Sequence, residues 1–304
     1  MGRAILLGLT AFAGLAAPVL AQAEPAQPVA TTQNALEAAW AAAHKTAILG
    51  PAKVKLLDQG ELAIPAGDVF VPAAEANRIM EAIGNPASPS RFGLIVSLKD
   101  QDIWMVDVSW LREGYVRDDE AKEWKPDTLL ASLKDNTEED NAGRKARGLP
   151  ALDVVGWAQP PAYDAAAHRL VWSMLVKDRG APAGLPQTVN YNTYALGREG
   201  YFSLDLITDS AHIAADRPVA AQLLGSLNFA AGKRYQDFNQ STDKVAAYGL
   251  AALVGVVAVK KLGLLALAGV FLLKVWKLGL LALAGAAAAF RKFFRRKADE
   301  DATL

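Results

Sequence analysis

The chain has no cysteine among its 304 residues. A disulfide framework is therefore excluded, and so are thiol nucleophiles and thiolate metal sites. Histidine is nearly as scarce, because only His44, His168 and His212 occur, at no spacing typical of metal ligands. Neither H-E-x-x-H nor G-x-S-x-G is present. We therefore expect no metal site and no cofactor.

Acidic residues, amides and proline are all missing between Val245 and Phe290. This apolar run is far longer than the roughly 20 residues that cross a bilayer. We expect residues 244–290 to anchor the chain in a lipid bilayer. The charges within the run are Lys260, Lys261, Lys274 and Lys277. Because a lysine at mid-bilayer is costly, these residues leave open whether the anchor crosses once or twice.

The first residues resemble a secretory signal peptide. Arg3 precedes a short apolar core, and Ala21-Gln22-Ala23 has the small-residue pattern of a cleavage site. We expect residues 1–23 to be removed and residues 24–33, which are rich in Pro, Ala, Gln and Thr, to form a disordered lead-in. The mature amino terminus would then lie outside the cytoplasm.

Charge is divided unevenly along the chain, although its overall net charge is zero. Residues 24–243 contain 21 Lys and Arg against 29 Asp and Glu, whereas residues 244–304 contain 10 against 3. By the positive-inside rule, the basic segment 291–304 is expected to be a cytoplasmic tail. The protein would then lie in the inner cell membrane with its main domain extracytoplasmic. An acidic domain of this kind argues against nucleic acid as a partner.

Residues 34–243 are predicted to form one extracytoplasmic α+β domain, with a mainly antiparallel sheet and inserted helices. Strands are expected at 52–57, 61–64, 68–71, 92–98, 103–111, 154–157, 169–177, 188–196 and 201–208, and helices at 34–45, 72–83, 126–147 and 216–227. In the strand 103–111, Trp104, Val106, Val108 and Trp110 alternate and are expected on one buried face. A domain of this size can bury a core without disulfides, so residues 24–243 are expected to fold without the anchor.

The second half of the long helix, from Thr137 to Arg147, is almost entirely polar or charged. Acidic residues precede basic ones by four positions, as Asp140 precedes Arg144. This spacing is typical of a solvent-exposed helix face, which we favour over a binding surface.

Two groups of polar residues are candidates for a functional site. Asn190, Asn192 and Tyr194 alternate along one strand, and the turn that follows it is expected to bring Arg198 and Glu199 close to them. This group is interpreted as a ligand-binding site or, preferably, as a structural Arg–carboxylate link, with Arg198 turned inward towards a segment near Asp118 or Asp164.

The second group consists of carboxylates. Asp118, Asp119 and Glu199 are the catalytic candidates for a carboxylate-dependent hydrolase of the envelope, since such enzymes leave no short motif. The alternative for Asp118-Asp119-Glu120 is an exposed turn, because the glycine and the alternation of a calcium loop are missing.

Several short motifs resemble the bacterial membrane-anchored family known as domain of unknown function 2167. They are Gly114-Tyr115-Val116-Arg117-Asp118-Asp119, Gly156-Trp157-Ala158, Pro161-Ala162-Tyr163-Asp164, Asn190-Tyr191-Asn192-Thr193, Leu196-Gly197-Arg198-Glu199-Gly200, Tyr235-Gln236-Asp237-Phe238 and the run from Thr242 to Gly249. The resemblance extends from about Trp40 to the anchor and departs at Tyr194, where a basic residue is expected. It implies an exported domain with a carboxy-terminal anchor and carries no activity.

Two functions therefore compete. The first is a noncatalytic, membrane-tethered domain that binds an envelope protein or peptide. The second is the envelope hydrolase. The hydrolase requires at least two of the three candidate carboxylates to converge in one pocket, whereas a binding domain requires a groove or an exposed patch.

Overall fold

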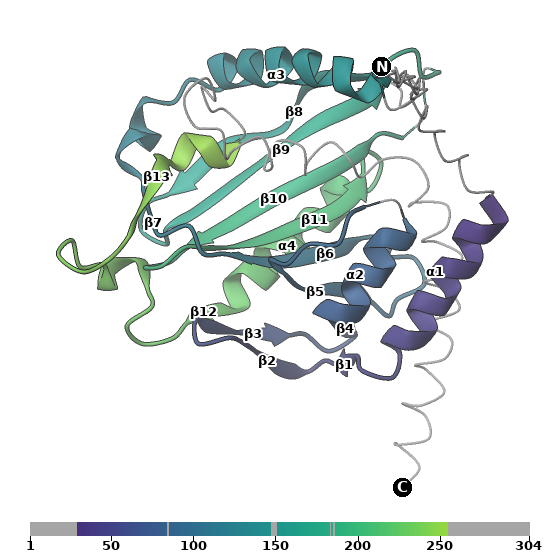
Figure 1. Cartoon of the computed structure of the whole chain (residues 1–304), viewed down its shortest axis with the longest axis horizontal. Helices are drawn as coiled ribbons and strands as arrows, with labels where there is room; N and C mark the ends of the chain where they lie inside the picture. The colour runs from purple at the N-terminus through teal and green to yellow at the C-terminus, as the bar shows by residue number, and fades with distance from the viewer. Residues whose placement is uncertain (1–28, 84, 147–150, 183, 185, 255–304) are drawn as a thin grey trace, which may run out of the picture.

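An eight-stranded antiparallel sheet runs through the part of the chain that the computed structural model describes, residues 29–83, 85–146, 151–182, 184 and 186–254 (Figure 1). Its strands, in spatial order, are β1 (Ile48–Leu49), β4 (Asp68–Pro72), β5 (Arg91–Ser97), β6 (Met105–Leu111), β11 (Tyr201–Asp209), β10 (Thr188–Leu196), β9 (Arg169–Asp178) and β8 (Leu152–Asp164). The predicted α+β class with a mainly antiparallel sheet is confirmed.

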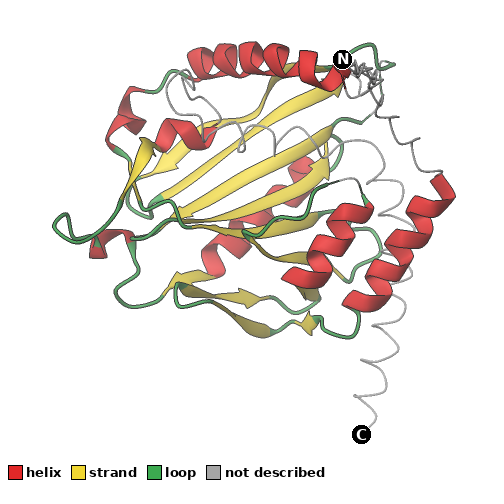
Figure 2. Cartoon of the chain, in the orientation of Figure 1, coloured by secondary structure: helices red, strands yellow, loops and turns green. Residues whose placement is uncertain are grey.

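Two smaller sheets and four α-helices complete the described fold (Figure 2). The smaller sheets are β2 (Ala52–Leu56), β3 (Gly60–Ile64) and β12 (Leu227–Phe229), and the parallel pair β7 (Tyr115–Arg117) and β13 (Val245–Gly249). The helices are α1 (Val29–Ala43), α2 (Ala73–Ala82), α3 (Pro126–Ala146) and α4 (Ile213–Ser226), with the 3-10 turns η1 (Asp119–Glu123), η2 (Tyr235–Asp237) and η3 (Leu250–Val254).

One face of the large sheet is covered by α4 and the sheet of β2, β3 and β12. Alternation along β6 and the residue before it sends Trp104, Val106, Val108 and Trp110 into this core, as predicted from the sequence. Val106 is the register partner of Leu206 on β11, which belongs to the same core. This face is therefore an apolar layer that continues across the central strands.

The opposite face is covered in two separate places (Figure 1). Helices α1 and α2 pack over β4, β5 and the start of β6, where Leu36, Trp40 and Ile79 are buried. Helix α3 and the turn η3 pack at the other end, over β8, β9 and β10, around Trp172 and Leu170. Both apolar clusters thus lie on one sheet face, at its two ends. The central strands between them carry other side chains on this face.

The polar half of α3 is buried in part, which corrects the predicted solvated face. Thr137, Asn141 and Arg144 are all nearly inaccessible to solvent. The Asn141 amide donates to the Leu152 carbonyl at 2.9 Å and accepts from the Leu152 N–H at 2.8 Å. Asn141 thus satisfies the hydrogen-bonding groups of the backbone at the start of β8. For this reason α3 needs a polar residue at position 141.

The segment Val245–Val254 belongs to the folded domain, although the sequence assigned it to the anchor. β13 pairs with β7, and Leu250, Leu253 and Val254 are buried in the cluster around Trp172. The Trp172 indole N–H also donates to the Leu253 carbonyl at 3.0 Å. An apolar run does not distinguish buried core from membrane span, so the domain ends later than predicted.

The chain's two ends were assigned to a signal peptide, an anchor and a tail. Residues 1–28 and 255–304 lie outside the described residues, whereas Val29–Gln33 of the expected lead-in are helical in α1. Within the residues that are described, no helix has both the length and the apolar character needed to cross a membrane.

The buried position of η3 predicts that the folded domain needs residues beyond Asp243. Full burial of a Leu or Val side chain contributes about 1.5–3 kcal/mol, so loss of Leu250, Leu253 and Val254 removes roughly 4–9 kcal/mol. This loss is comparable to the whole stability of a typical domain. We expect a chain of residues 24–254 to unfold cooperatively on heating and one of residues 24–243 to show no cooperative transition or a much lower Tm. Equal Tm values would contradict this role of η3.

Candidate functional site

A row of register partners crosses the sheet on its doubly covered face. Leu94, Asp107, Asp205, Asn192 and Trp172 follow one another on β5, β6, β11, β10 and β9. The two ends of this row lie in the two apolar clusters. Its three central residues are polar, so this face of the sheet is polar between the two apolar clusters.

We call this polar part of the sheet face the polar strip. It consists of Arg91 on β5, Asp107 and Ser109 on β6, Ser203 and Asp205 on β11, and Asn190 and Asn192 on β10. Alternation places these residues on the face opposite the continuous apolar layer. Ser109 and Ser203 are direct register partners, which continues the strip along β6 and β11.

A buried ion pair closes one side of the strip. The Arg91 guanidinium donates to Asp107 through Nε at 3.1 and 3.0 Å and through Nη2 at 2.9 Å. Arg91 also donates to the Asn77 side chain of α2 through Nη1. Burial raises the pKa of Asp107, and the facing guanidinium opposes that rise. The arrangement neutralises one of the strip's two carboxylates.

The second carboxylate, Asp205, stands beside this pair and has no counter-ion among the described residues. Burial, reinforced by the negative charge of Asp107, raises the pKa of Asp205 from 3.8 to about 7. Its Oδ1 atom is buried and accepts no hydrogen bond from any residue that the structure describes. Buried polar atoms are normally paired, so this unpaired carboxylate oxygen is unusual in a folded domain.

The two asparagines of β10 lie in the strip, so the structure brings the predicted pair together. The Asn192 amide donates to the Asn190 backbone carbonyl at 3.2 Å, and Tyr194 donates to Asn192 Oδ1 at 3.5 Å. Oδ1 of Asn190 is buried and has no partner among the described residues. Asn190 and Asp205 therefore each contribute an unpaired acceptor atom.

Arg198 and Glu199 lie away from the strip, in the turn that follows β10. Arg198 donates to both oxygens of Asp243, through Nε at 2.6 Å and Nη2 at 2.8 Å, and to the Gly232 carbonyl at 3.2 Å. The expected link to a carboxylate and a carbonyl is present, but the partner segment is 232–243 instead of the region around Asp118 or Asp164. Arg198 joins the β10–β11 turn to the chain that leads into β13.

Glu199 belongs to a neighbouring group of charges. It accepts from Lys233 at 2.6 Å, from Gln59 at 2.9 Å and from Arg112 at 3.2 Å. Lys233 also pairs with Asp58 at 2.9 Å. These contacts hold three turns together and lower the pKa of Glu199, mainly through the Lys233 bond. The predicted site of Asn190, Asn192, Arg198 and Glu199 is thus divided between two places.

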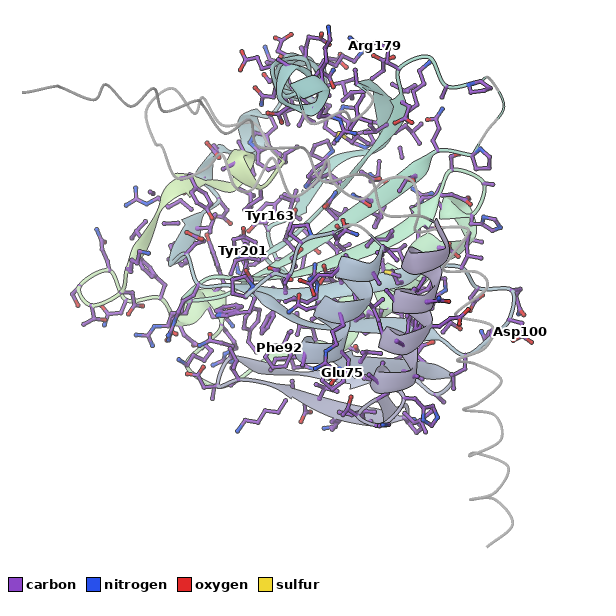
Figure 3. All side chains as sticks on the ribbon, turned by 45° about the vertical axis from the view of Figure 1, so that its right-hand side comes forward. Glu75, Phe92, Asp100, Tyr163, Arg179 and Tyr201 are labelled. Atoms are coloured by element: carbon purple, nitrogen blue, oxygen red, sulfur yellow. The ribbon has the colours of Figure 1, made fainter. Side chains whose placement is uncertain are left out.

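The candidate carboxylates near β7 also have separate surroundings. Asp118 accepts from the Tyr163 hydroxyl at 2.6 Å, and Tyr163, labelled in Figure 3, lies 3.3 Å from His168 Nδ1. Asp119 is exposed in η1. Glu120 accepts from the Ala251 N–H at 2.6 Å and so fixes the start of η3. Within the described residues, Asp118 and Glu199 share no contact partner.

Sequence reasoning missed the strip's charged residues, Arg91, Asp107 and Asp205, and its two serines, Ser109 and Ser203. The available signal was a carboxylate at the centre of each of two strongly apolar strands, 105–111 and 201–209. A charge at such a position is rarely buried unless it is paired or functional. For a metal, no group of three His, Cys, Asp or Glu side chains gathers within the described part of the chain.

The fold and the strip define an α+β domain with a polar site on one sheet face. The chain belongs to the family described as Protein of unknown function (DUF2167), whose model matches residues 48–284. No curated protein matches the chain.

Two solved structures show a low similarity to this chain. Cyanobacterial PsbP (CyanoP) from Synechocystis sp. PCC 6803 is 10% identical with a TM-score of 0.36, covering 59% of this chain and 92% of that one. The Saccharomyces cerevisiae Ran-binding protein Mog1p is 12% identical with a TM-score of 0.35, covering 63% of this chain and 100% of that one.

The raised pKa of Asp205 predicts a specific dependence of stability on pH. The stabilising contribution of its protonated form is complete below pH 3.8 and is lost as the pH rises through about 7. Because asparagine does not ionise, Asp205→Asn removes the loss of stability that accompanies the rise in pH. We expect the variant to match the wild type at pH 4 and to exceed its free energy of unfolding by roughly 2–4 kcal/mol at pH 8. Chemical denaturation at both pH values measures the difference.

The matched control is Asp135→Asn, which removes an exposed carboxylate of α3. It should change stability little and equally at both pH values. A stability difference between Asp205→Asn and the wild type that is the same at pH 4 and pH 8 would contradict the raised pKa.

Proposed function

We propose that this protein is a noncatalytic binding domain tethered to a membrane, and that the polar strip contacts its ligand. The observation that carries this proposal is the pair of buried, unpaired acceptor atoms, Oδ1 of Asp205 and Oδ1 of Asn190. An unpaired buried polar atom costs about 1–3 kcal/mol. The polar strip keeps two such atoms between the two helix-covered ends of the sheet. A bound ligand would supply the hydrogen bonds that these atoms lack.

The tether and the location of the domain rest on the sequence. The signal-like segment 1–23, the apolar run and the basic segment 291–304 support an extracytoplasmic domain, a membrane anchor and a cytoplasmic end. Since Val245–Val254 is folded into the domain, the anchor is proposed to begin after Val254. The partner would be an envelope protein or peptide that reaches the strip beside the membrane.

The alternative of a hydrolase that uses Asp118, Asp119 and Glu199 has less support. Asp118 bonds to Tyr163, Asp119 is exposed, and Glu199 is held by Lys233 and Arg112. A hydrolase needs two carboxylates that face one bond of the substrate. The described contacts give Asp118 and Glu199 structural roles at different turns, and Asp119 is exposed to solvent.

Site-directed photocrosslinking tests the binding role of the strip. A diazirine-bearing amino acid at Ser203, which is half-buried in the strip, should yield a discrete crosslinked species in native membranes. The same amino acid at the exposed position Asp135 of α3 is the control and should not yield that species. Adding Asp205→Asn to the Ser203 protein should weaken the crosslink. Equal crosslinking at both positions, or none at Ser203, would contradict a ligand site in the strip.

Reporter fusions test the proposed orientation. Alkaline phosphatase, which is active only outside the cytoplasm, should be active when fused after Val254 and inactive when fused after Lys297. This result follows from one crossing, or any odd number, between the two points. Activity at both points would indicate an even number of crossings, and activity only after Lys297 would indicate the reverse orientation.

A further inference from the structure

We infer that the polar strip binds a ligand through a protonated amine, with Asp205 as the counter-ion and Asn190 as a neutral acceptor. This inference rests on the proposed function and adds the chemical class of the ligand. Both unpaired atoms of the strip, Oδ1 of Asp205 and Oδ1 of Asn190, are acceptors. The ligand must therefore bring hydrogen-bond donors to them.

The charges of the strip also favour a cation. Arg91 and Asp107 bond to each other and leave no net charge, so an ionised Asp205 contributes one uncompensated negative charge. An ammonium group supplies one positive charge and three donors, enough for the unpaired carboxylate oxygen of Asp205 and the unpaired amide oxygen of Asn190. A charge-assisted bond to a carboxylate is also about twice as strong as a neutral one.

A proton competes with the amine for the same carboxylate. Among the described residues, the charged groups that face Asp205 are Asp107 and Arg91, which is paired with Asp107. The hydroxyl of Tyr194 lies on the adjacent strand. With its pKa near 7, Asp205 is half protonated at neutral pH without a ligand. An amine must displace that proton, so binding should strengthen as the pH rises.

Equilibrium titration of the full chain in detergent with n-butylamine measures this competition at constant ionic strength. Butylamine stays protonated across the range, so only the protein titrates. We expect about thirtyfold tighter binding at pH 8.5 than at pH 5.5, as a single group with a pKa near 7 requires. The neutral n-butanol should not bind. Asp205→Asn should abolish amine binding, and Asp135→Asn should leave it unchanged.

Two larger probes separate the sources of such an amine. Tighter binding of acetyl-Ala-Lys-Ala-amide than of glycerophosphoethanolamine would assign the strip to a lysine side chain of a peptide, and the opposite order would assign it to a lipid headgroup. Butylamine that binds no better than butanol would overturn the amine inference. If crosslinking at Ser203 still succeeds in that case, the strip binds a ligand of other chemistry, whereas failure of both experiments overturns the proposed function as well.

Discussion

The bidentate ion pair between Arg91 and Asp107 is the interaction on which the polar strip depends. It places a carboxylate in the middle of a covered sheet and satisfies it with a guanidinium fixed by Asn77 of α2. Removing one member of a buried pair typically costs about 3–5 kcal/mol, because the other charge remains without a partner. The pair also keeps a negative charge beside Asp205, which helps to hold that residue near its protonation midpoint. Structure and site chemistry therefore depend on the same contact.

The sheet offers this site because its two faces are covered differently. One face carries a continuous apolar layer beneath α4 and the small sheet, whereas the other carries two apolar clusters with the strip between them. The charged turn around Glu199 and Arg198 lies at the end of the same strands and joins them to the segments around Lys233 and Asp243. A rigid frame of this kind holds Asp205 and Asn190 in place, so a ligand would meet acceptors that are already positioned.

Much of the fold was predictable because alternation and turn residues act locally. The hairpin of β5 and β6, including the inward set from Trp104 to Trp110, follows from the sequence of those strands alone. The polar strip does not follow from the sequence of any one strand, because Asp107 and Asp205 are neighbours only through the pairing of β6 with β11. The η3 segment was missed for another reason, since Leu250–Val254 continues without a break into the apolar run that follows it. Asn190 and Asn192 lie on one face of β10, as alternation indicates, whereas their expected neighbours Arg198 and Glu199 make their contacts from the turn that follows the strand.

The central claim is that Asp205 has no counter-ion among the described residues and is held near its protonation midpoint. Carbon-13 NMR of aspartate-labelled protein measures this directly, with the Asp205 carboxyl signal assigned through its loss in Asp205→Asn. The account predicts that this signal titrates near pH 7 and moves to lower pH when butylamine is present. Titration near 4, unaffected by the amine, would show that the Asp205 carboxylate is already solvated or paired and would contradict the account.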